Sequence, residues 1–398
     1  MVLALSRQPS VRGCDRWRAL ASPFATAKGF HVTQRAPTLA TLRRYAVART
    51  LFAPTTLARA IRTLGFVQAD PIRAPARAQD LTLRHRVRDY RAGDLERAYP
   101  KLAIEEDFFV NYGFMPRDTH ALMHPRTPRK HWPKARHDKA NAVLEFVRAQ
   151  GIAHPRDVDA HFKHGKVRNW FGGSTNASTQ LLDEMHYRGL VRIAARQGGT
   201  RLYAARNIAP TPSDAQQAMD ALVDVIVGKY APLPERSLSE LVSRLRGGAP
   251  QWASECRAAL QRARARLPSV EIDHMRWYWP AGETPLAAKW ASSAIDQNVA
   301  RLLAPFDPVV WDRRRFELFW NWSYRFEAYT PAAKRVRGYY ALPLLWRDTI
   351  IGWGNLSVVE GRLKADLGYV TGKAPREKAF KHALDEELQR VERFLDLV

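Results

Sequence analysis

A β-hairpin pattern occupies Leu190-Val191-Arg192-Ile193 and Arg201-Leu202-Tyr203-Ala204, two short runs joined by the loop Arg196-Gln197-Gly198-Gly199-Thr200. Glycines at the tip between two strand-like runs are typical of a hairpin turn. Helical periodicity before the hairpin predicts three helices, over 139–149, 154–162 and 174–188. Three helices followed by a β-hairpin is the winged-helix arrangement, so the sequence predicts such a module over residues 132–209.

The same order of elements is predicted on both sides of this module. After the linker Pro210-Thr211-Pro212, another winged helix is expected at 210–280, with helices over 214–230, 237–246 and 251–266 and a strand over 270–278. Helices over 39–49 and 56–62, with threonine N-caps, begin a related module at 37–131. The chain would then hold three tandem copies of one unit.

From Ala300 onward the pattern changes to β. Strands are expected over 324–329, 337–345, 349–358 and 362–369, and a last helix over 377–397. Residues 281–398 are therefore expected to form a β-rich C-terminal domain with a terminal helix.

The composition indicates a polyanionic partner. The 398 residues carry 63 Lys and Arg against 39 Asp and Glu, a formal net charge of +24, and the basic residues are spread from end to end. Such a distribution suits a groove that follows a phosphate backbone. The alternative is a generally arginine-rich composition without a specific partner.

Neither a membrane span nor a disulfide framework is indicated. No uncharged run approaches the roughly 20 residues that a spanning helix needs, and Cys14 and Cys256 are the only cysteines. We expect a soluble, cytoplasmic protein associated with the nucleoid. Residues 1–36 are predicted to be a basic, disordered extension; a transit peptide is the alternative.

One polar pair is a candidate for chemistry. In Gly65-Phe66-Val67-Gln68-Ala69-Asp70-Pro71, an extended backbone places Gln68 and Asp70 on one face while Val67 and Ala69 point into the core. The alternative is structural, with Asp70 capping the following turn and Gln68 bonding backbone groups.

Several long strings resemble the winged-helix family of YcaQ-like and AlkZ-like DNA glycosylases, which unhook interstrand crosslinks. These strings are Leu64–Asp70 with Ala76-Arg77-Ala78, Leu303–Arg313, Tyr329–Arg335 and Gly338–Leu345. The likeness covers most of residues 37–398. Family members carry a Gln-apolar-Gln or Gln-apolar-Asp catalytic motif, and Gln68-Ala69-Asp70 matches the second form.

The resemblance implies an α+β fold: tandem winged helix-turn-helix modules curved around duplex DNA, followed by a C-terminal β-barrel-like domain. Two segments depart from the family pattern. Residues 105–116 stand where YcaQ-like sequences have an aromatic, histidine-rich stretch, and Gln79-Asp80 stands where they have a histidine pair. These differences indicate a separate subfamily.

It also implies a DNA repair glycosylase acting on N7-alkylguanine-type or crosslinked bases in duplex DNA. Asp70 would stabilise the cationic sugar of the transition state and polarise a water, and Gln68 would hold the water or the lesion. Because no lysine lies in the motif, no Schiff-base lyase step is expected and the enzyme is predicted to be monofunctional. We also expect a monomer that needs no cofactor. The alternative function is a non-catalytic winged-helix regulator or architectural DNA binder.

Candidate DNA contacts come from four places in the chain, and for each a solvated basic face or a helix cap is the alternative. They are Arg73, Arg77, Arg84 and Arg86 with His85 after the motif; Ser174, Thr175 and Asn176 before a helix; Arg196 and Arg201 in the wing; and Lys334, Arg335 and Arg337 near the C-terminal strands. No metal site is expected. His120 and His124 have helical spacing, as part of a set with His131 and His137, but no companion carboxylate or thiolate at ligand spacing is visible.

Overall fold

Two short helices precede the candidate site in the computed structural model, which describes residues 36–127, 131–168, 173–207, 214–290 and 298–397. They are α1 (Leu39–Thr50) and α2 (Leu57–Leu64). Thr38 Oγ1 accepts the Thr41 N–H at 3.2 Å and Thr56 Oγ1 accepts the Arg59 N–H at 3.4 Å, so both predicted threonine caps are confirmed. Of the predicted basic extension, residues 1–35 lie outside the described part of the chain.

A small antiparallel sheet follows α2. It comprises β1 (Val67–Gln68), β2 (Ile104–Phe108) and β3 (Tyr112–Pro116) in the order β1-β3-β2. Gln68 lies opposite Gly113, where an added Cβ would be 2.3 Å from the Val67 carbonyl oxygen. Only glycine lets the two backbones approach this closely. The surrounding helices are α3 (Ala78–Leu83), α4 (Asp94–Ala98), η1 (Tyr99–Lys101) and α5 (Arg117–Ala121).

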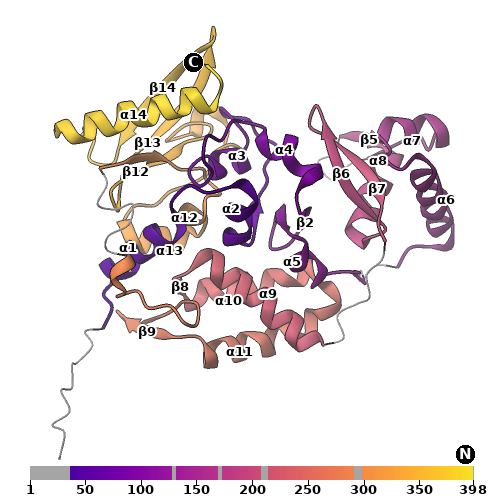
Figure 1. Ribbon diagram of the computed structural model, residues 1–398, viewed down its shortest axis with the longest axis horizontal. Coiled ribbons are helices and arrows are strands. Elements are labelled where there is room, and N and C mark those ends of the chain that lie inside the picture. Colours follow the sequence, from indigo (N-terminus) through magenta and orange to yellow (C-terminus); the bar gives the residue numbers. More distant parts are fainter. Residues whose placement is uncertain (1–35, 128–130, 169–172, 208–213, 291–297, 398) are drawn as a thin grey trace, which may run out of the picture. The chain divides into compact units, whose positions relative to one another are not determined.

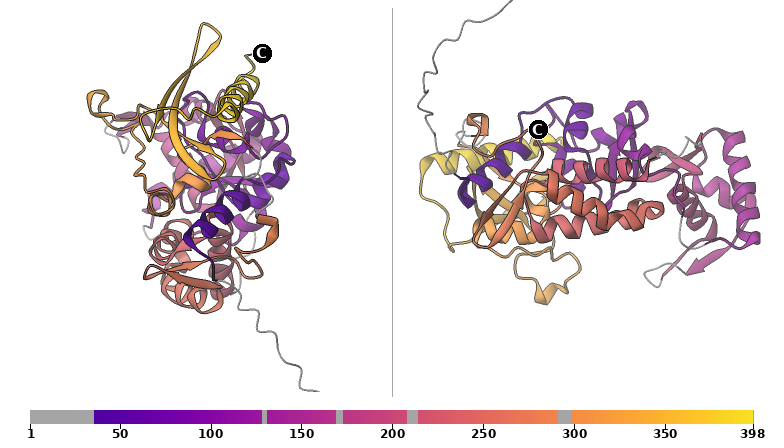
Figure 2. Two further views of the ribbon diagram at one scale, coloured as in Figure 1. Left: turned by 90° about the vertical axis from the view of Figure 1, so that its left-hand side faces the viewer. Right: turned by 90° about the horizontal axis from the view of Figure 1, so that it is seen from below.

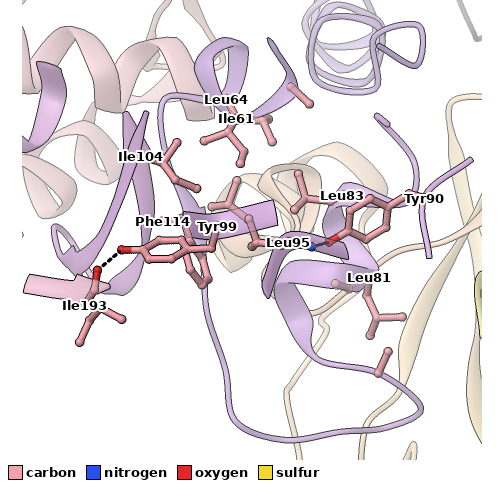
Figure 3. Close-up of a cluster of buried hydrophobic side chains, with 14 of the residues drawn as sticks. Ile61, Leu64, Leu81, Leu83, Tyr90, Leu95, Tyr99, Ile104, Phe114 and Ile193 are labelled. Atoms are coloured by element: carbon pink, nitrogen blue, oxygen red, sulfur yellow. Dashed lines mark hydrogen bonds between the residues drawn. The ribbon is translucent and has the colours of Figure 1, made fainter. Parts of the chain in front are cut away.

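The hydrophobic core next to this sheet also includes Ile193, which comes from a hairpin later in the chain. Figure 3 shows Tyr99 between Phe114 and Ile193, with the Tyr99 hydroxyl donating to the Ile193 carbonyl at 3.2 Å. The rings of Tyr99 and Phe114 meet edge to face at 5.8 Å. Burying each such large apolar side chain contributes about 1.5–3 kcal/mol, so this contact holds the site sheet against the hairpin.

The central segment has the predicted order of three helices and a hairpin (Figure 1). The elements are α6 (Lys134–Gln150), α7 (Pro155–Phe162), α8 (Ala177–Arg188), β6 (Val191–Gln197) and β7 (Thr200–Ala205). The structure adds a two-stranded pair, β4 (Lys166–Arg168) with β5 (Ser174–Asn176). Gly198 and Gly199 form the hairpin turn with φ of 56° and 86°.

The next segment repeats the order with a shorter sheet. It contains α9 (Ala215–Tyr230), β8 (Leu233–Pro234), α10 (Glu235–Gly248), η2 (Pro250–Glu255), α11 (Cys256–Arg266), β9 (Ser269–Ile272) and β10 (Met275–Tyr278). The predicted single strand over 270–278 is instead a hairpin, because Asp273 and His274 take left-handed φ values of 50° and 59°. The predicted linker 210–212 lies outside the described residues.

The C-terminal sheet is four-stranded and open at both edges. After η3 (Ala288–Trp290), its strands are β11 (Ala300–Leu302), β12 (Leu342–Trp346), β13 (Thr349–Val359) and β14 (Arg362–Tyr369), in that order across the sheet. The sheet curls in the left view of Figure 2, so the predicted barrel is a half-barrel. Helix α14 (Lys378–Phe394) packs against β11. Figure 1 shows α14 lying against this sheet.

Three expectations for this region were wrong. Residues 324–329 form no strand, the strand expected over 337–345 is limited to Leu342–Trp346, and two unpredicted helices are present, α12 (Pro308–Trp311) and α13 (Arg313–Trp320). Asp307 and Asp312 cap these helices: their carboxylates accept the N–H groups of Val309 and Arg315. These caps stabilise helices in an aromatic-rich stretch that could otherwise form strands. In the described part of the chain, no helix has the length and hydropathy needed to cross a membrane.

Candidate active site

Strand β1 and the loop after it hold the predicted catalytic pair. Val67 is fully buried, and pairing with β3 extends to Ala69, whose N–H donates to the Tyr112 carbonyl at 2.9 Å. This extended backbone puts Gln68 and Asp70 on the face opposite Val67. Gln68 is only 6% exposed, and Asp70 is half-buried.

The Gln68 amide is held by a tryptophan from the C-terminal region. Trp311 Nε1 donates to Gln68 Oε1 at 2.8 Å. Indole N–H is only a donor, so the contact fixes which end of the amide is the oxygen and leaves the Gln68 NH₂ group pointing elsewhere. Trp311 lies at the end of α12, and its ring contacts Tyr230 at 4.9 Å. Sequence analysis missed Trp311 as a site residue, although it lies inside one of the family-like strings.

Partial burial and one local hydrogen bond determine the environment of the Asp70 carboxylate. Its Oδ1 accepts the Ile72 N–H at 2.9 Å, and its own N–H donates to Gln79 Oε1 at 3.3 Å. Burial raises the pKa of Asp70, and the bond from Ile72 only partly offsets this. The carboxylate is thus poorly solvated, which strengthens its interaction with any nearby positive charge.

Aromatic side chains lie within electrostatic range of Asp70. Tyr340 is buried, its hydroxyl has no hydrogen-bond partner among the described residues, and burial followed by the Asp70 charge raises its pKa. The Tyr340 ring contacts Phe326 at 5.2 Å, and Phe326 contacts Phe306 at 5.2 Å. Sequence analysis did not single out Tyr340 as a site residue, although it lies inside the family-like string Gly338–Leu345. A half-buried carboxylate beside an aromatic wall is suited to stabilising a flat, cationic group.

Two of the predicted arginines lie together next to this loop. Arg73 is exposed, and Arg77 forms an ion pair with Glu96. Burial, then the charges of Arg73 and Arg196, lower the pKa of Arg77. A Cβ at Gly199 would be 2.5 Å from Arg77 Nη2, so the tip of the β6–β7 hairpin lies against this arginine. The structure therefore brings the hairpin and the motif loop into contact.

Comparison with known proteins identifies the family. The family model described as "DNA glycosylase AlkZ-like" matches residues 61–394. The chain belongs to the AlkZ-like DNA glycosylase family. The solved structure of Streptomyces sahachiroi DNA glycosylase AlkZ is also similar, with a TM-score of 0.56 and 13% identity over 90% of this chain and 96% of that one. At this identity the structural match supports the fold, and the family model supports the enzyme class.

Arg84, His85 and Arg86 of this AlkZ-like DNA glycosylase face the interior. Arg84 Nη2 donates to Glu387 Oε1 at 2.5 Å, and His85 Nε2 lies 3.1 Å from the Leu302 carbonyl. Burial and neighbouring arginines lower the pKa of His85, so its ring is neutral. Arg86 is fully buried and makes a two-pronged pair with Asp307 at 2.8 and 3.0 Å. The expected phosphate contacts of Arg84 and Arg86 do not fit this burial, because buried carboxylates and carbonyls occupy their guanidinium groups.

The two predicted arginines of the β6–β7 hairpin in this glycosylase bind a carboxylate of the site sheet. Arg196 Nε donates to Glu106 Oε2 at 2.8 Å, and Arg201 Nε donates to Glu106 Oε1 at 3.3 Å. Burial alone would raise the pKa of Glu106, but Arg196 and Arg201 outweigh it and lower the pKa. The Arg201 guanidinium also lies over the Tyr112 ring at 4.4 Å. Their geometry makes Arg196 and Arg201 links between the β2–β3 pair and the β6–β7 hairpin, so a phosphate would have to compete with Glu106.

The other predicted DNA contacts are more accessible. Ser174 is exposed and Thr175 is partly exposed in β5, whereas Asn176 Nδ2 donates to Asp159 Oδ2 at 2.9 Å. Lys334 is exposed. Arg335 stacks on Tyr339 at 5.0 Å, and Arg337 donates to the Ser323 carbonyl at 2.7 Å.

A buried His–Asp cluster was also missed, because its carboxylate comes from β2 whereas its histidines lie in and just after α5. Asp107 Oδ2 accepts from His124 Nε2 at 2.7 Å and from His120 Nε2 at 3.0 Å, the spacing of a potential ion site. However, the two rings stack in parallel at 4.0 Å, so one ion cannot lie in both ring planes. Arg126 donates to Asp107 Oδ1 at 2.9 Å, and Arg206 Nη2 lies 3.5 Å from His120 Nε2. The cluster is therefore better described as a hydrogen-bonded network.

Proposed function

We propose that this protein hydrolyses the N-glycosidic bond of N7-alkylguanine-type or crosslinked bases in duplex DNA, as a monofunctional glycosylase. The observation that carries the proposal is the poorly solvated Asp70 carboxylate beside the oriented Gln68 amide. Only Asp70 Oδ1 is engaged, by the Ile72 N–H, and no described residue bonds Oδ2. One carboxylate oxygen is thus available to a sugar or a water.

Asp70 would act on the sugar. Breaking the bond leaves a cationic, oxocarbenium-like sugar, and a fixed carboxylate next to it stabilises the developing charge. At about 4 Å and an effective dielectric constant near 20, two unit charges interact by about 4 kcal/mol. A barrier change of this size is about a thousandfold in rate. The same carboxylate can polarise the attacking water as a general base.

Gln68 would position the water or the edge of the lesion. Since Trp311 occupies its oxygen at 2.8 Å, the amide presents its two N–H donors to an acceptor in the site. No acid is needed for the departing base, because an N7-alkylated guanine is already cationic.

A lyase step is not part of the proposal. Lys229 donates to the Phe66 carbonyl next to the motif, but it is only 2% exposed and cannot reach a sugar. The enzyme would therefore release the base and leave an abasic site.

DNA binding would come from winged-helix modules at 37–131, 132–209 and 210–280, working as a monomer together with the C-terminal domain. The formal charge of +24 supports binding dominated by phosphates. Affinity for undamaged duplexes should then fall steeply with salt and depend little on sequence.

A gel assay tests this function. Wild type and Asp70→Asn are incubated with duplexes that carry a single N7-methylguanine or a nitrogen-mustard crosslink, and alkali then cleaves the abasic product. We expect excision by wild type and about a thousandfold slower excision by Asp70→Asn, with DNA affinity nearly unchanged in filter binding. Asn keeps the acceptor for Ile72, so the local turn is preserved. Tight binding without excision by wild type on either substrate would favour a non-catalytic DNA binder.

A further inference from the structure

The loop between α13 and β12 is closed by one carboxylate. Both oxygens of Glu327 accept backbone N–H groups from the C-terminal side of the loop. The Val336 N–H lies 3.2 Å from Oε1, and the Arg337 N–H lies 2.8 Å from Oε2. Arg335 Nε donates back to the Thr330 carbonyl at 2.8 Å. Burial raises the pKa of Glu327, but these N–H groups outweigh it and lower the pKa, so the carboxylate is ionised at neutral pH.

The loop is also fastened to the C-terminal sheet. Asn355 Nδ2, on β13, donates to the Arg337 carbonyl at 2.7 Å. Gly338 has a φ of 115°, and an added Cβ there would lie 2.4 Å from the Asn355 side chain. Residues 327–339 therefore form a pinned loop, which is seen in light orange extending from its neighbours in the right view of Figure 2.

This pinned loop exposes apolar side chains. Tyr329 is 80% exposed and Val336 is 77% exposed, although both belong to a loop with defined hydrogen bonds. The only ring contact of Tyr329 among the described residues is an edge contact with Phe326 at 6.0 Å. A large aromatic side chain held out in water by a fixed loop has the features of a binding residue.

Position and charge indicate what Tyr329 meets. Phe326 connects it to Tyr340 in the aromatic wall of the site, and Asp70 is close enough for its charge to raise the pKa of Tyr329, after burial as the first cause. The exposed Lys334 lies on the same loop, so the loop carries both an exposed aromatic ring and a cation that suits a phosphate.

We propose that Tyr329 stacks on the bases of duplex DNA beside the nucleotide attacked at Asp70, with the loop 327–339 holding the ring in place. The proposal rests on the proposed function, because it takes duplex DNA as the partner. Withdrawing a nucleotide from the stack leaves neighbouring bases exposed, and a rigid aromatic side chain can cover them. Stacking on a base face requires no particular sequence, which agrees with a repair enzyme that acts at any position.

Fluorescence of 2-aminopurine tests the contact without requiring excision. The probe is placed next to a tetrahydrofuran abasic analogue in a duplex, and wild type, Tyr329→Phe and Tyr329→Ala are titrated onto it. Wild type and Tyr329→Phe should change the fluorescence alike, since both keep the ring. Tyr329→Ala should lose most of the change and bind this duplex about tenfold more weakly, the size of one lost base stack. Ile152→Ala, which truncates another exposed apolar residue (55% exposed), is the matched control and should behave as wild type.

Glu327→Gln provides a second variant, because it keeps Tyr329 but replaces the ionised acceptor that closes the loop. It should show a reduced fluorescence change, and circular dichroism should confirm that both variants remain folded. A change in Tyr329→Ala equal to that of wild type, or no change with wild type, would overturn the proposal. Excision of N7-methylguanine by wild type with an unaltered signal in Tyr329→Ala would refute the loop contact alone. A signal that depends on Tyr329 without excision would refute only the glycosylase function.

Discussion

Replacing Arg86 separates a DNA-contact role from a structural one. Arg86 was predicted from sequence to bind phosphate, yet its side chain is fully buried and pairs with the equally buried Asp307. Its Nε also donates to the Thr50 carbonyl at 2.9 Å and its Nη1 to the Thr82 carbonyl at 2.7 Å. Arg86→Met removes all of these donors while keeping much of the side-chain volume.

The expected loss of stability is large. Removing one partner of a buried ion pair leaves an uncompensated buried charge and costs about 3–5 kcal/mol. Asp307 is the N-cap of α12, and α12 carries Trp311, which holds Gln68. Arg86→Met should therefore lower the free energy of unfolding by about this amount and also slow base excision at temperatures where the protein is still folded.

The assay combines urea unfolding with a salt titration of DNA binding. A phosphate contact contributes about 0.9 to the slope of log K against log salt, so a structural Arg86 predicts no change in slope. The exposed Arg73 supplies the control: Arg73→Met should leave stability within about 0.5 kcal/mol. The double variant Arg86→Met/Asp307→Asn, which removes the stranded charge but keeps an N-cap acceptor, should recover part of the loss. A slope reduced by about one with a stability change below about 1 kcal/mol would refute the reasoning.

Two further predictions concern the residues that support the motif. Trp311→Phe removes the N–H that orients Gln68, which should slow single-turnover excision by about two- to tenfold at unchanged DNA affinity; Trp320→Phe, which loses a bond to a distant carbonyl, is the control. Burial, then the Arg86 charge, lower the pKa of Lys229 to about 7 from 10.5. Between about pH 7 and pH 10.5, Lys229 is therefore protonated in the unfolded chain but not in the folded chain, so the folded chain binds fewer protons. The unfolding free energy of wild type should rise with pH across this window by up to about 1.4 kcal/mol per unit, whereas Lys229→Met should lack the rise; parallel pH profiles for the two proteins would contradict it.

Elements with a strong local signal were predicted correctly. The threonine caps of α1 and α2, the hairpin β6–β7 with its Gly198-Gly199 turn, and the long strands β13 and β14 are encoded by neighbouring residues. The region between β11 and β12 was not predicted correctly, because its aromatic residues alternate with polar ones as they do in a strand. There the Asp307 and Asp312 caps make two helices, and the Glu327 carboxylate closes a loop.

The candidate site shows the same division. The extended motif was predictable because alternation in a strand is a local property, and it places Gln68 and Asp70 on one face. The roles of the arginines were not, because Arg86 and Asp307 are separated by 221 residues. The sequence around an arginine does not indicate whether the folded chain pairs it with a buried carboxylate from a distant segment.

By itself, the sequence determined the family, the polar pair of the motif, the basic character and the order of most helices and hairpins. Only the tertiary structure decided that Trp311 orients Gln68, that Arg196 and Arg201 bind Glu106, and that Tyr329 stands exposed on a loop closed by Glu327. The physical reason is the distance along the sequence over which each interaction acts. Capping, turns and periodicity act over a few residues, whereas burial and ion pairing depend on which distant segments the folded chain brings together.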